Sequence, residues 1–128
     1  MEKIVVKTHS KVEMVDVTSE VARVVQKSRL KDGLCVVFIP HTTAGITINE
    51  NADPSVCRDV IKELNKVIPF DDNYAHSEGN AASHIKSSIM GSSVSIIVEG
   101  GQLRLGTWQG IYLCEFDGPR TREVWVKI

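Results

Sequence analysis

The chain has no long apolar run. Its first residues, Met1–Lys7, mix charged with apolar side chains and contain no small-residue cleavage site. No later apolar segment is long enough to span a bilayer, so the pattern argues against both a secretory signal and a membrane span. We therefore expect a soluble, cytoplasmic protein.

An excess of one charge is also missing, because 15 basic residues nearly balance 16 acidic ones and no run of lysine or arginine occurs. A broad surface for nucleic acid or for an anionic membrane therefore has no electrostatic support. The expected partners are small molecules.

Cysteine is scarce. Cys35, Cys57 and Cys114 are odd in number, widely separated and placed among aliphatic or core-patterned residues. They are interpreted as small buried thiols, and neither a disulfide framework nor a cysteine-ligated zinc site is expected. This usage fits a reducing cytoplasm.

Several sequence signatures are absent as well. The chain has no phosphate loop of the Walker type, no glycine-rich dinucleotide fingerprint, no nucleophile elbow, no tandem repeat and no coiled-coil heptad. A length of 128 residues with 42% hydrophobic content suits one domain over residues 1–128.

The first third of the chain predicts strands around one helix. Residues 4–5 and 12–17 have strand patterns and are expected to form a hairpin through residues 9–10. A helix capped by Thr18 follows. The apolar run 34–39 then predicts a strand covered on both faces.

The middle and the end of the chain add two helices and more strands. Residues 46–49 alternate as a strand, and Asp53 with Pro54 predicts the start of a helix with an apolar stripe. The stripe consists of Val56, Val60, Leu64 and Val67. A short helix ending at Gly91 is expected to bury Ala82, Ile85 and Ile89, with His84 on its polar side. Residues 94–128 predict a β meander with turns at Gly100-Gly101 and Asp117-Gly118-Pro119.

Three histidines lie among small, hydrogen-bonding and carboxylate residues. His41 directly follows the buried strand, and His76 and His84 flank Glu78-Gly79-Asn80. Neutral imidazoles bind divalent metals, and three of them with an open position can activate water or hold an anion. Unrelated, hydrogen-bonded histidines are the alternative, and Glu78 is equally interpreted as a ligand, a general base or a solvated turn residue.

A second constellation follows the Gly100-Gly101 turn. Arg104, Thr107 and Gln109 offer hydrogen bonds to an oxygen-rich ligand, and Trp108 offers a stacking face. Ordinary hairpin packing is the alternative explanation. Arg120 is a candidate phosphate contact, although an edge arginine that improves solubility is at least as consistent with the sequence.

Four motifs together resemble the YjbQ family, also called UPF0047. They are His41-Thr42-Thr43-Ala44-Gly45-Ile46-Thr47-Ile48-Asn49-Glu50-Asn51-Ala52-Asp53-Pro54, Glu78-Gly79-Asn80, His84-Ile85-Lys86 and Gly106-Thr107-Trp108-Gln109-Gly110-Ile111. The resemblance implies an α+β fold with a curled, mixed sheet or sandwich and packed helices, assembled as a homotrimer.

The resemblance also implies a site and an activity. A divalent metal, zinc above all, would map to His41, His76 and His84, with Glu78 and Asn80 as catalytic residues. Arg104, Thr107, Trp108, Gln109 and Arg120 would contact a phosphorylated ligand. The implied activity is a secondary thiamine phosphate synthase, for whose pyrophosphate substrate magnesium is a further possible partner. A metal-dependent hydrolase of a phosphorylated or ester substrate and a non-enzymatic metal- or metabolite-binding module are the alternatives.

Overall fold

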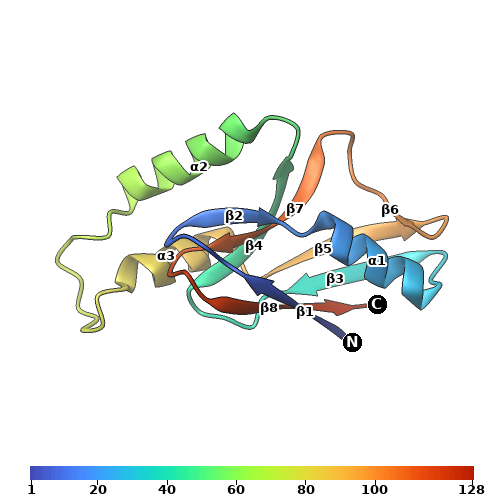
Figure 1. The fold of residues 1–128 in the computed structure, drawn as a ribbon, viewed down its shortest axis with the longest axis horizontal. Helices are drawn as coiled ribbons and strands as arrows, with labels where there is room; N and C mark the ends of the chain where they lie inside the picture. Colours follow the sequence, from blue (N-terminus) through green and yellow to red (C-terminus); the bar gives the residue numbers. More distant parts are fainter.

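Two antiparallel sheets form the framework of the computed structural model, which describes residues 1–128 (Figure 1). The larger sheet has the strand order β1-β8-β3-β5-β6, and the smaller has the order β2-β7-β4. The larger sheet consists of β1 (Glu2–Lys7), β8 (Thr121–Lys127), β3 (Gly33–Phe38), β5 (Ser93–Glu99) and β6 (Gln102–Leu103). The smaller consists of β2 (Glu13–Asp16), β7 (Gln109–Glu115) and β4 (Ala44–Glu50).

Three helices join these strands. Asp16 accepts hydrogen bonds from the amide and the hydroxyl of Thr18, the first residue of α1 (Thr18–Ser28). The N-cap residue of α1 is Val17, which makes no side-chain cap hydrogen bond, so the predicted cap by Thr18 is wrong. Asp53 accepts from the Ser55 amide at 2.9 Å and so caps α2 (Pro54–Val67). The third helix, α3 (Ala81–Met90), ends at Gly91, whose φ of 100° favours glycine.

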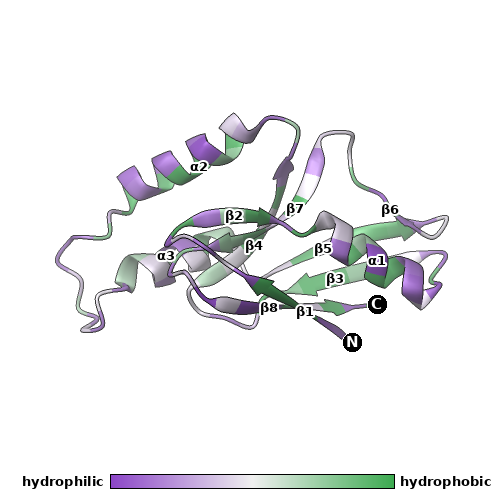
Figure 2. Cartoon of the chain, viewed as in Figure 1, coloured by the Kyte–Doolittle hydropathy of each residue, from purple (hydrophilic) through white to green (hydrophobic).

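The main core lies between the two sheets and is closed at one end by α1. It consists of Val6, Val17, Val21, Val25, Cys35, Val37, Ile39, Ala44, Ile46, Ile96, Val98, Ile111, Leu113, Val124 and Val126. Apolar residues on alternate positions of β3, β5 and β7 point into it, as the period of a strand requires. The hydropathy colouring shows this green centre flanked by purple loops (Figure 2).

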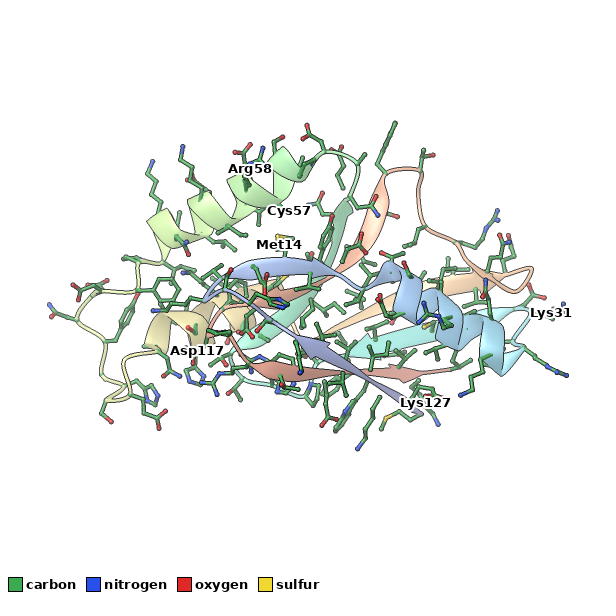
Figure 3. All side chains as sticks on the ribbon, in the orientation of Figure 1. Met14, Lys31, Cys57, Arg58, Asp117 and Lys127 are labelled. Carbon is green, nitrogen blue, oxygen red and sulfur yellow. The ribbon has the colours of Figure 1, made fainter.

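A second, smaller core lies on the other face of the smaller sheet, beneath α2. Tyr112, Cys114 and Phe116 form its buried centre. Met14 and Cys57 pack against this centre, and Figure 3 shows them between α2 and β2. No residue of α2 is fully buried, whereas Val21 and Val25 of α1 are.

The α+β fold class with a curled sheet and packed helices is confirmed, but the predicted mixed sheet is wrong, because every strand pair is antiparallel. The predicted strands, the three helices and the hairpin at Gly100-Gly101 are all present. Cys35 and Cys114 are buried free thiols as predicted, whereas Cys57 is half-buried. None of the helices is both long and apolar enough to cross a membrane.

Two predicted strand pairings are wrong. β1 pairs with β8 and β2 pairs with β7, so residues 4–5 and 12–17 form no hairpin and belong to different sheets. The predicted C-terminal meander is also divided between the sheets, because β7 pairs with β4 while β8 pairs with β3. A strand pattern identifies the buried face of a strand but not its neighbour, which long-range packing decides.

Two predictions of burial are also wrong. β3 is covered on one face only, since Leu34 is 58% exposed while Cys35 is fully buried. On α3, Ile85 and Ile89 are exposed, and the buried face consists of Ala82, Ser83, Lys86 and Ser87. Apart from Lys86, small side chains face the protein there because α3 packs closely against β4, where a Cβ on Gly45 would lie 2.9 Å from the Gly91 carbonyl oxygen.

Candidate functional site

His41 and His84 line one pocket. The pocket has a volume of about 410 Å³ and lies between the connection from β3 to β4 and the C-terminal half of α3. Its lining residues are His41, Thr42, Ala44, His84, Ser87, Ser88, Gly91 and Ser92. Seven of these eight are polar residues or glycine, so the pocket suits an oxygen-rich ligand better than an apolar one.

The pocket forms because α3 ends against the edge of β4. The Ile46 amide donates to the Gly91 carbonyl at 3.0 Å, and the Ile39 amide donates to the Ser92 carbonyl at 2.8 Å. These two bonds fix both the end of β3 and the start of β4 against the end of α3. His41, which follows β3, and His84, on α3, are thereby brought to the same pocket.

A backbone hydrogen bond fixes the orientation of His41. The Glu123 amide of β8 donates to His41 Nε2 at 2.9 Å. Because Nε2 accepts a hydrogen, the neutral ring carries its proton on Nδ1, an assignment that follows from this hydrogen bond. Burial, and secondarily the nearby Arg122 charge, lowers the pKa of His41 below its ordinary 6.5. His41 is therefore a neutral ring with one N–H left to donate.

A buried ion pair lies beneath His41. Arg122 donates from Nη2 to Glu115 Oε2 at 2.5 Å and from Nε to Glu115 Oε1 at 2.9 Å. Arg122 also donates to the Thr43 hydroxyl at 2.8 Å, which ties the connection that carries His41 to both sheets. Burial by itself raises the pKa of Glu115, but hydrogen bonds from Arg122, the Asp117 amide and Thr8 outweigh it, and the pKa is lowered.

His76 stands next to His84 outside the pocket lining. The two rings are arranged edge to face with centroids 5.2 Å apart. His76 Nε2 lies 3.8 Å from Glu78 Oε2, and both side chains are well exposed. His76 is therefore close to both His84 and Glu78, whereas His41 shares only the pocket with His84.

Asn80 and Arg120 converge on Asp117. Asn80 Nδ2 donates to Asp117 Oδ2 at 2.9 Å, and Arg120 Nη2 donates to the same oxygen at 3.0 Å. Burial raises the pKa of Asp117, but these two hydrogen bonds and the arginine charges lower it overall. Arg120 is thus engaged with its own turn, and neither residue is among those that line the pocket.

The three histidines do not form a coordination set within one chain. No three histidine, cysteine, aspartate or glutamate side chains are arranged to hold a metal ion. In addition, Nε2 of His41 already accepts the Glu123 amide hydrogen, and its Nδ1 carries the proton. The residues as placed do not fit a three-histidine metal site, and the predicted zinc or magnesium stays a prediction.

The second constellation lies at the opposite end of β4. The Asn51 amide donates to the Trp108 carbonyl at 2.9 Å, and Gln109 pairs with Glu50 at the far end of that strand. A strand of this length spans roughly 20 Å. Gln109 Oε1 accepts from the Gly106 amide, and Arg104 lies 3.5 Å from Glu99. Trp108 is 63% exposed. These residues, with Thr107 between them, do not reach the histidine pocket of the same chain.

Sequence reasoning missed the ion pair and the hydrogen-bond partner of His41. Glu115 carries a detectable signal, because it is a carboxylate at the end of the apolar run of β7 and a buried charge needs a partner. The Glu123 amide carries none, since a backbone donor leaves no trace in the sequence. Ser92 was also missed, because a serine after a helix is typical of any turn.

Comparisons with known proteins agree with this architecture. Residues 2–128 match the family described as "UPF0047 protein YjbQ-like". A UPF0047 protein of Methanocaldococcus jannaschii is 54% identical over 123 residues, covering 96% of this chain and 89% of the relative. The UPF0047 protein YugU of Bacillus subtilis is 51% identical over 124 residues, covering 96% and 94%.

Solved structures show the same fold. A crystal structure from Clostridium acetobutylicum, described as an uncharacterized conserved protein of the yjbq/upf0047 family, superposes with a TM-score of 0.99 at 55% identity. It covers 100% of this chain and 99% of that one. A protein of unknown function from Sulfolobus solfataricus gives a TM-score of 0.94 at 34% identity, covering 98% and 92%. Fold, motifs and relatives agree, and the chain belongs to the YjbQ-like UPF0047 family.

Proposed function

We propose that the pocket between the β3–β4 connection and α3 binds a small phosphorylated ligand, and that the protein is a secondary thiamine phosphate synthase. The observation that carries the proposal is the fixed state of His41. Its Nε2 accepts the Glu123 amide, so its Nδ1–H is the donor left for a ligand. A neutral N–H donor among serine and threonine hydroxyls suits phosphate oxygens.

The proposed reaction uses these donors on the leaving group. In the transfer, the bond between the pyrimidine methylene carbon and the pyrophosphate oxygen breaks, and pyrophosphate leaves with the electron pair. The thiazole phosphate nitrogen then forms the new carbon–nitrogen bond. Donors that hold the departing oxygens stabilise the negative charge that develops there, and stabilisation of this kind accounts for much of the rate enhancement in many enzymes. His41 and the hydroxyls of Thr42 and Ser92 are assigned this binding role.

Assembly is part of the proposal. Leu34, Phe38 and Ile97 leave an apolar face on the outer side of the larger sheet, along β3, which leads to His41. Exposed apolar faces of this kind are typical of contacts between subunits. We propose a homotrimer in which a neighbouring chain supplies the Arg104–Gln109 region, which the same chain cannot bring to its own pocket. Light scattering on purified protein checks the subunit number, and a monomeric mass contradicts this part.

The test of the reaction is formation of thiamine phosphate from its two precursors. We expect turnover by the wild type and a loss of at least about 100-fold in kcat/KM for His41→Ala and His84→Ala. Val67→Ala, on the exposed side of α2, is the matched control and retains full activity. Reactions with added chelator, zinc or magnesium show whether a metal is required. Turnover no higher than in a protein-free control with the same metal refutes the synthase.

Hydrolysis of a phosphorylated or ester substrate is the second candidate, and the 3.8 Å approach of His76 Nε2 to Glu78 Oε2 favours it. A carboxylate beside an imidazole is a suitable general base for water. Wild type and Glu78→Gln are compared on phosphate monoesters and carboxylic esters, and equal rates remove Glu78 from the mechanism. Saturable phosphate binding without any turnover identifies the binding-only module instead.

A further inference from the structure

Lys86 is the largest fully buried side chain of the protein, with no solvent exposure. It lies on α3, two residues after His84, and faces away from the histidine pocket. Lysine is almost never fully buried without an anionic partner. The ion pairs of the lysines and arginines are Lys27–Glu2, Arg104–Glu99, Arg120–Asp117 and Arg122–Glu115, so Lys86 has no carboxylate partner.

The ammonium group of Lys86 instead joins two other parts of the chain. Nζ donates to Asn65 Oδ1 of α2 at 2.6 Å. It also lies 3.5 Å from the centroid of the Phe70 ring, and Lys11 Nζ lies 4.1 Å from the centroid of the same ring. Cation–π contacts of this kind strengthen when they are desolvated. Lys86 therefore holds both the end of α2 and Phe70 against α3.

This contact bears on the position of His76. The connecting segment (residues 68–80) joins α2 to α3, contains no helix or strand, and carries His76 and Glu78. Its hydrogen bonds near Tyr74 are local, from the Tyr74 hydroxyl to the Pro69 carbonyl and from the Tyr74 amide to the Asp72 carbonyl. At the α2 end the segment is held by the buried Ile68 side chain and by Phe70, which contacts Lys86 and Lys11, and at the α3 end by the Asn80–Asp117 hydrogen bond.

We propose that Lys86 is a positioning residue whose buried ammonium anchors the connecting segment to α3 and thereby sets where His76 stands against His84. The positioning role itself does not depend on the proposed function. Its consequence does, namely that the arrangement of His76 and His84 contributes to the site. Asn80 directly precedes α3, so the Asn80–Asp117 hydrogen bond fixes only the end of the connecting segment that lies next to this helix. The end next to α2 needs a contact of its own. The Lys86 contact with Phe70 is the one that ties this end of the segment to α3.

The experiment reads the histidine rings in ligand-free protein by NMR. In the wild type, ring protons of His76 and His84 give a mutual nuclear Overhauser effect, because the ring centroids are 5.2 Å apart. Lys86→Ala loses this effect and moves the His76 resonances to those of a solvated imidazole. His41 stays unchanged, because the Glu123 amide holds it independently.

Matched variants separate positioning from a general loss of structure. Lys66→Ala removes an exposed lysine of α2 near Asn65 and keeps the effect between the rings. Lys86→Gln retains a donor for Asn65 but has no charge to place over the Phe70 ring, so it loses the effect as Lys86→Ala does. If circular dichroism shows that Lys86→Ala is unfolded, Phe70→Leu takes its place, since it removes the ring while leaving Lys86 intact. An unchanged effect in folded Lys86→Ala or Phe70→Leu, or an equal loss in Lys66→Ala, overturns the proposal.

Titration with inorganic phosphate keeps the two proposals distinguishable. If both hold, phosphate shifts the His41 and His84 resonances of the wild type, and Lys86→Ala binds phosphate roughly tenfold more weakly, as for the loss of other supporting contacts. If the wild type binds no phosphate but the rings separate in Lys86→Ala, the positioning role stands and the proposed function fails. If the wild type binds phosphate and the rings stay together in Lys86→Ala, the proposed function stands and the positioning role fails.

Discussion

Two buried cations hold the two halves of the candidate site, and they are held in opposite ways. Arg122, beneath His41, donates two hydrogen bonds to Glu115 and two to Thr43. Lys86, beneath α2, meets only an amide oxygen and an aromatic ring. The first is an ion pair whose polar atoms are satisfied, whereas the second is a buried charge without a counter-charge.

The difference shows two ways in which a buried charge is stabilised. Direct hydrogen bonds lower the pKa of Glu115 despite its burial, so the pair remains ionised. Burial and then the nearby Lys11 charge lower the pKa of Lys86 to about 8. The pocket floor is therefore expected to be rigid, and the anchor of α2 to be the weaker and more adjustable of the two.

The largest effect is expected from breaking the pair. Arg122→Met leaves Glu115 buried without a partner and should lower the free energy of unfolding by about 3–5 kcal/mol. Urea denaturation measures it. The double variant Arg122→Met with Glu115→Gln removes the uncompensated charge and should regain part of the loss. A single variant as stable as the wild type contradicts the role of the pair.

The same contrast is expected between the two amphipathic helices. Val25 of α1 is 1% exposed, so Val25→Ala should cost about 2 kcal/mol of unfolding free energy, from lost apolar burial and the cavity left behind. Val67 of α2 is 67% exposed, and Val67→Ala should stay within about 0.5 kcal/mol. Thermal unfolding of both variants tests the contrast, and equal losses in the two helices refute it.

The lowered pKa of Lys86 makes the free energy of unfolding depend on pH in the alkaline range. The pKa of Lys86 is about 8 in the folded protein against an ordinary 10.5, so the unfolded chain binds more protons between these values. Its contribution to stability therefore rises with pH over this range, by at most about 1.4 kcal/mol per pH unit.

A control isolates this contribution. Burial raises the pKa of Cys114 to about 12, and ionisation of the unfolded thiol opposes the trend. The quantity to measure is therefore the difference in melting temperature between the wild type and Lys86→Met at pH 7.5, 8.5 and 9.5. A difference that does not change with pH shows that Lys86 keeps its ordinary pKa.

The lowered pKa values of Glu115 and Asp117 make the free energy of unfolding depend on pH in the acid range. The pKa values of Glu115 and Asp117 are lowered below their ordinary 4.5 and 3.8, so their stabilisation is fully present above those values and is lost as pH falls through the folded pKa values. Unfolding free energy from urea titrations between pH 5 and 2 should fall for the wild type. It should fall less for the variant with both Arg122→Met and Glu115→Gln.

The smallest expected effect is at His41 itself. Its pKa is lowered by burial and then by Arg122, so Arg122→Met should move the His41 titration upward, toward 6.5. NMR of the imidazole against pH measures this shift. An unmoved or lowered midpoint in the folded variant shows that the arginine charge does not reach the ring.

Local features of the fold were predictable to a large extent. Asp53 and Pro54 predicted the start of α2, because aspartate is a favourable N-cap and proline a favourable first helical residue. The run from Leu34 to Ile39 predicted β3, because a short apolar stretch between Gly33 and Pro40 suits a strand. The pairing of β1 was not predictable, because its partner β8 lies at the other end of the chain. The same holds for Ile85 and Ile89, whose outward direction depends on how α3 meets β4.

The candidate site shows the same division. The sequence by itself determined that histidines, small polar residues and a carboxylate occur near Pro40 and before α3, because residue types and their local order are properties of the sequence. Tertiary structure alone decided that His41 accepts an amide hydrogen from β8, that Glu115 and Arg122 pair beneath it, and that Trp108 lies at the far end of β4. The reason is physical: each of these contacts joins residues distant in the chain, and their energy appears only when the two sheets close on each other and exclude water.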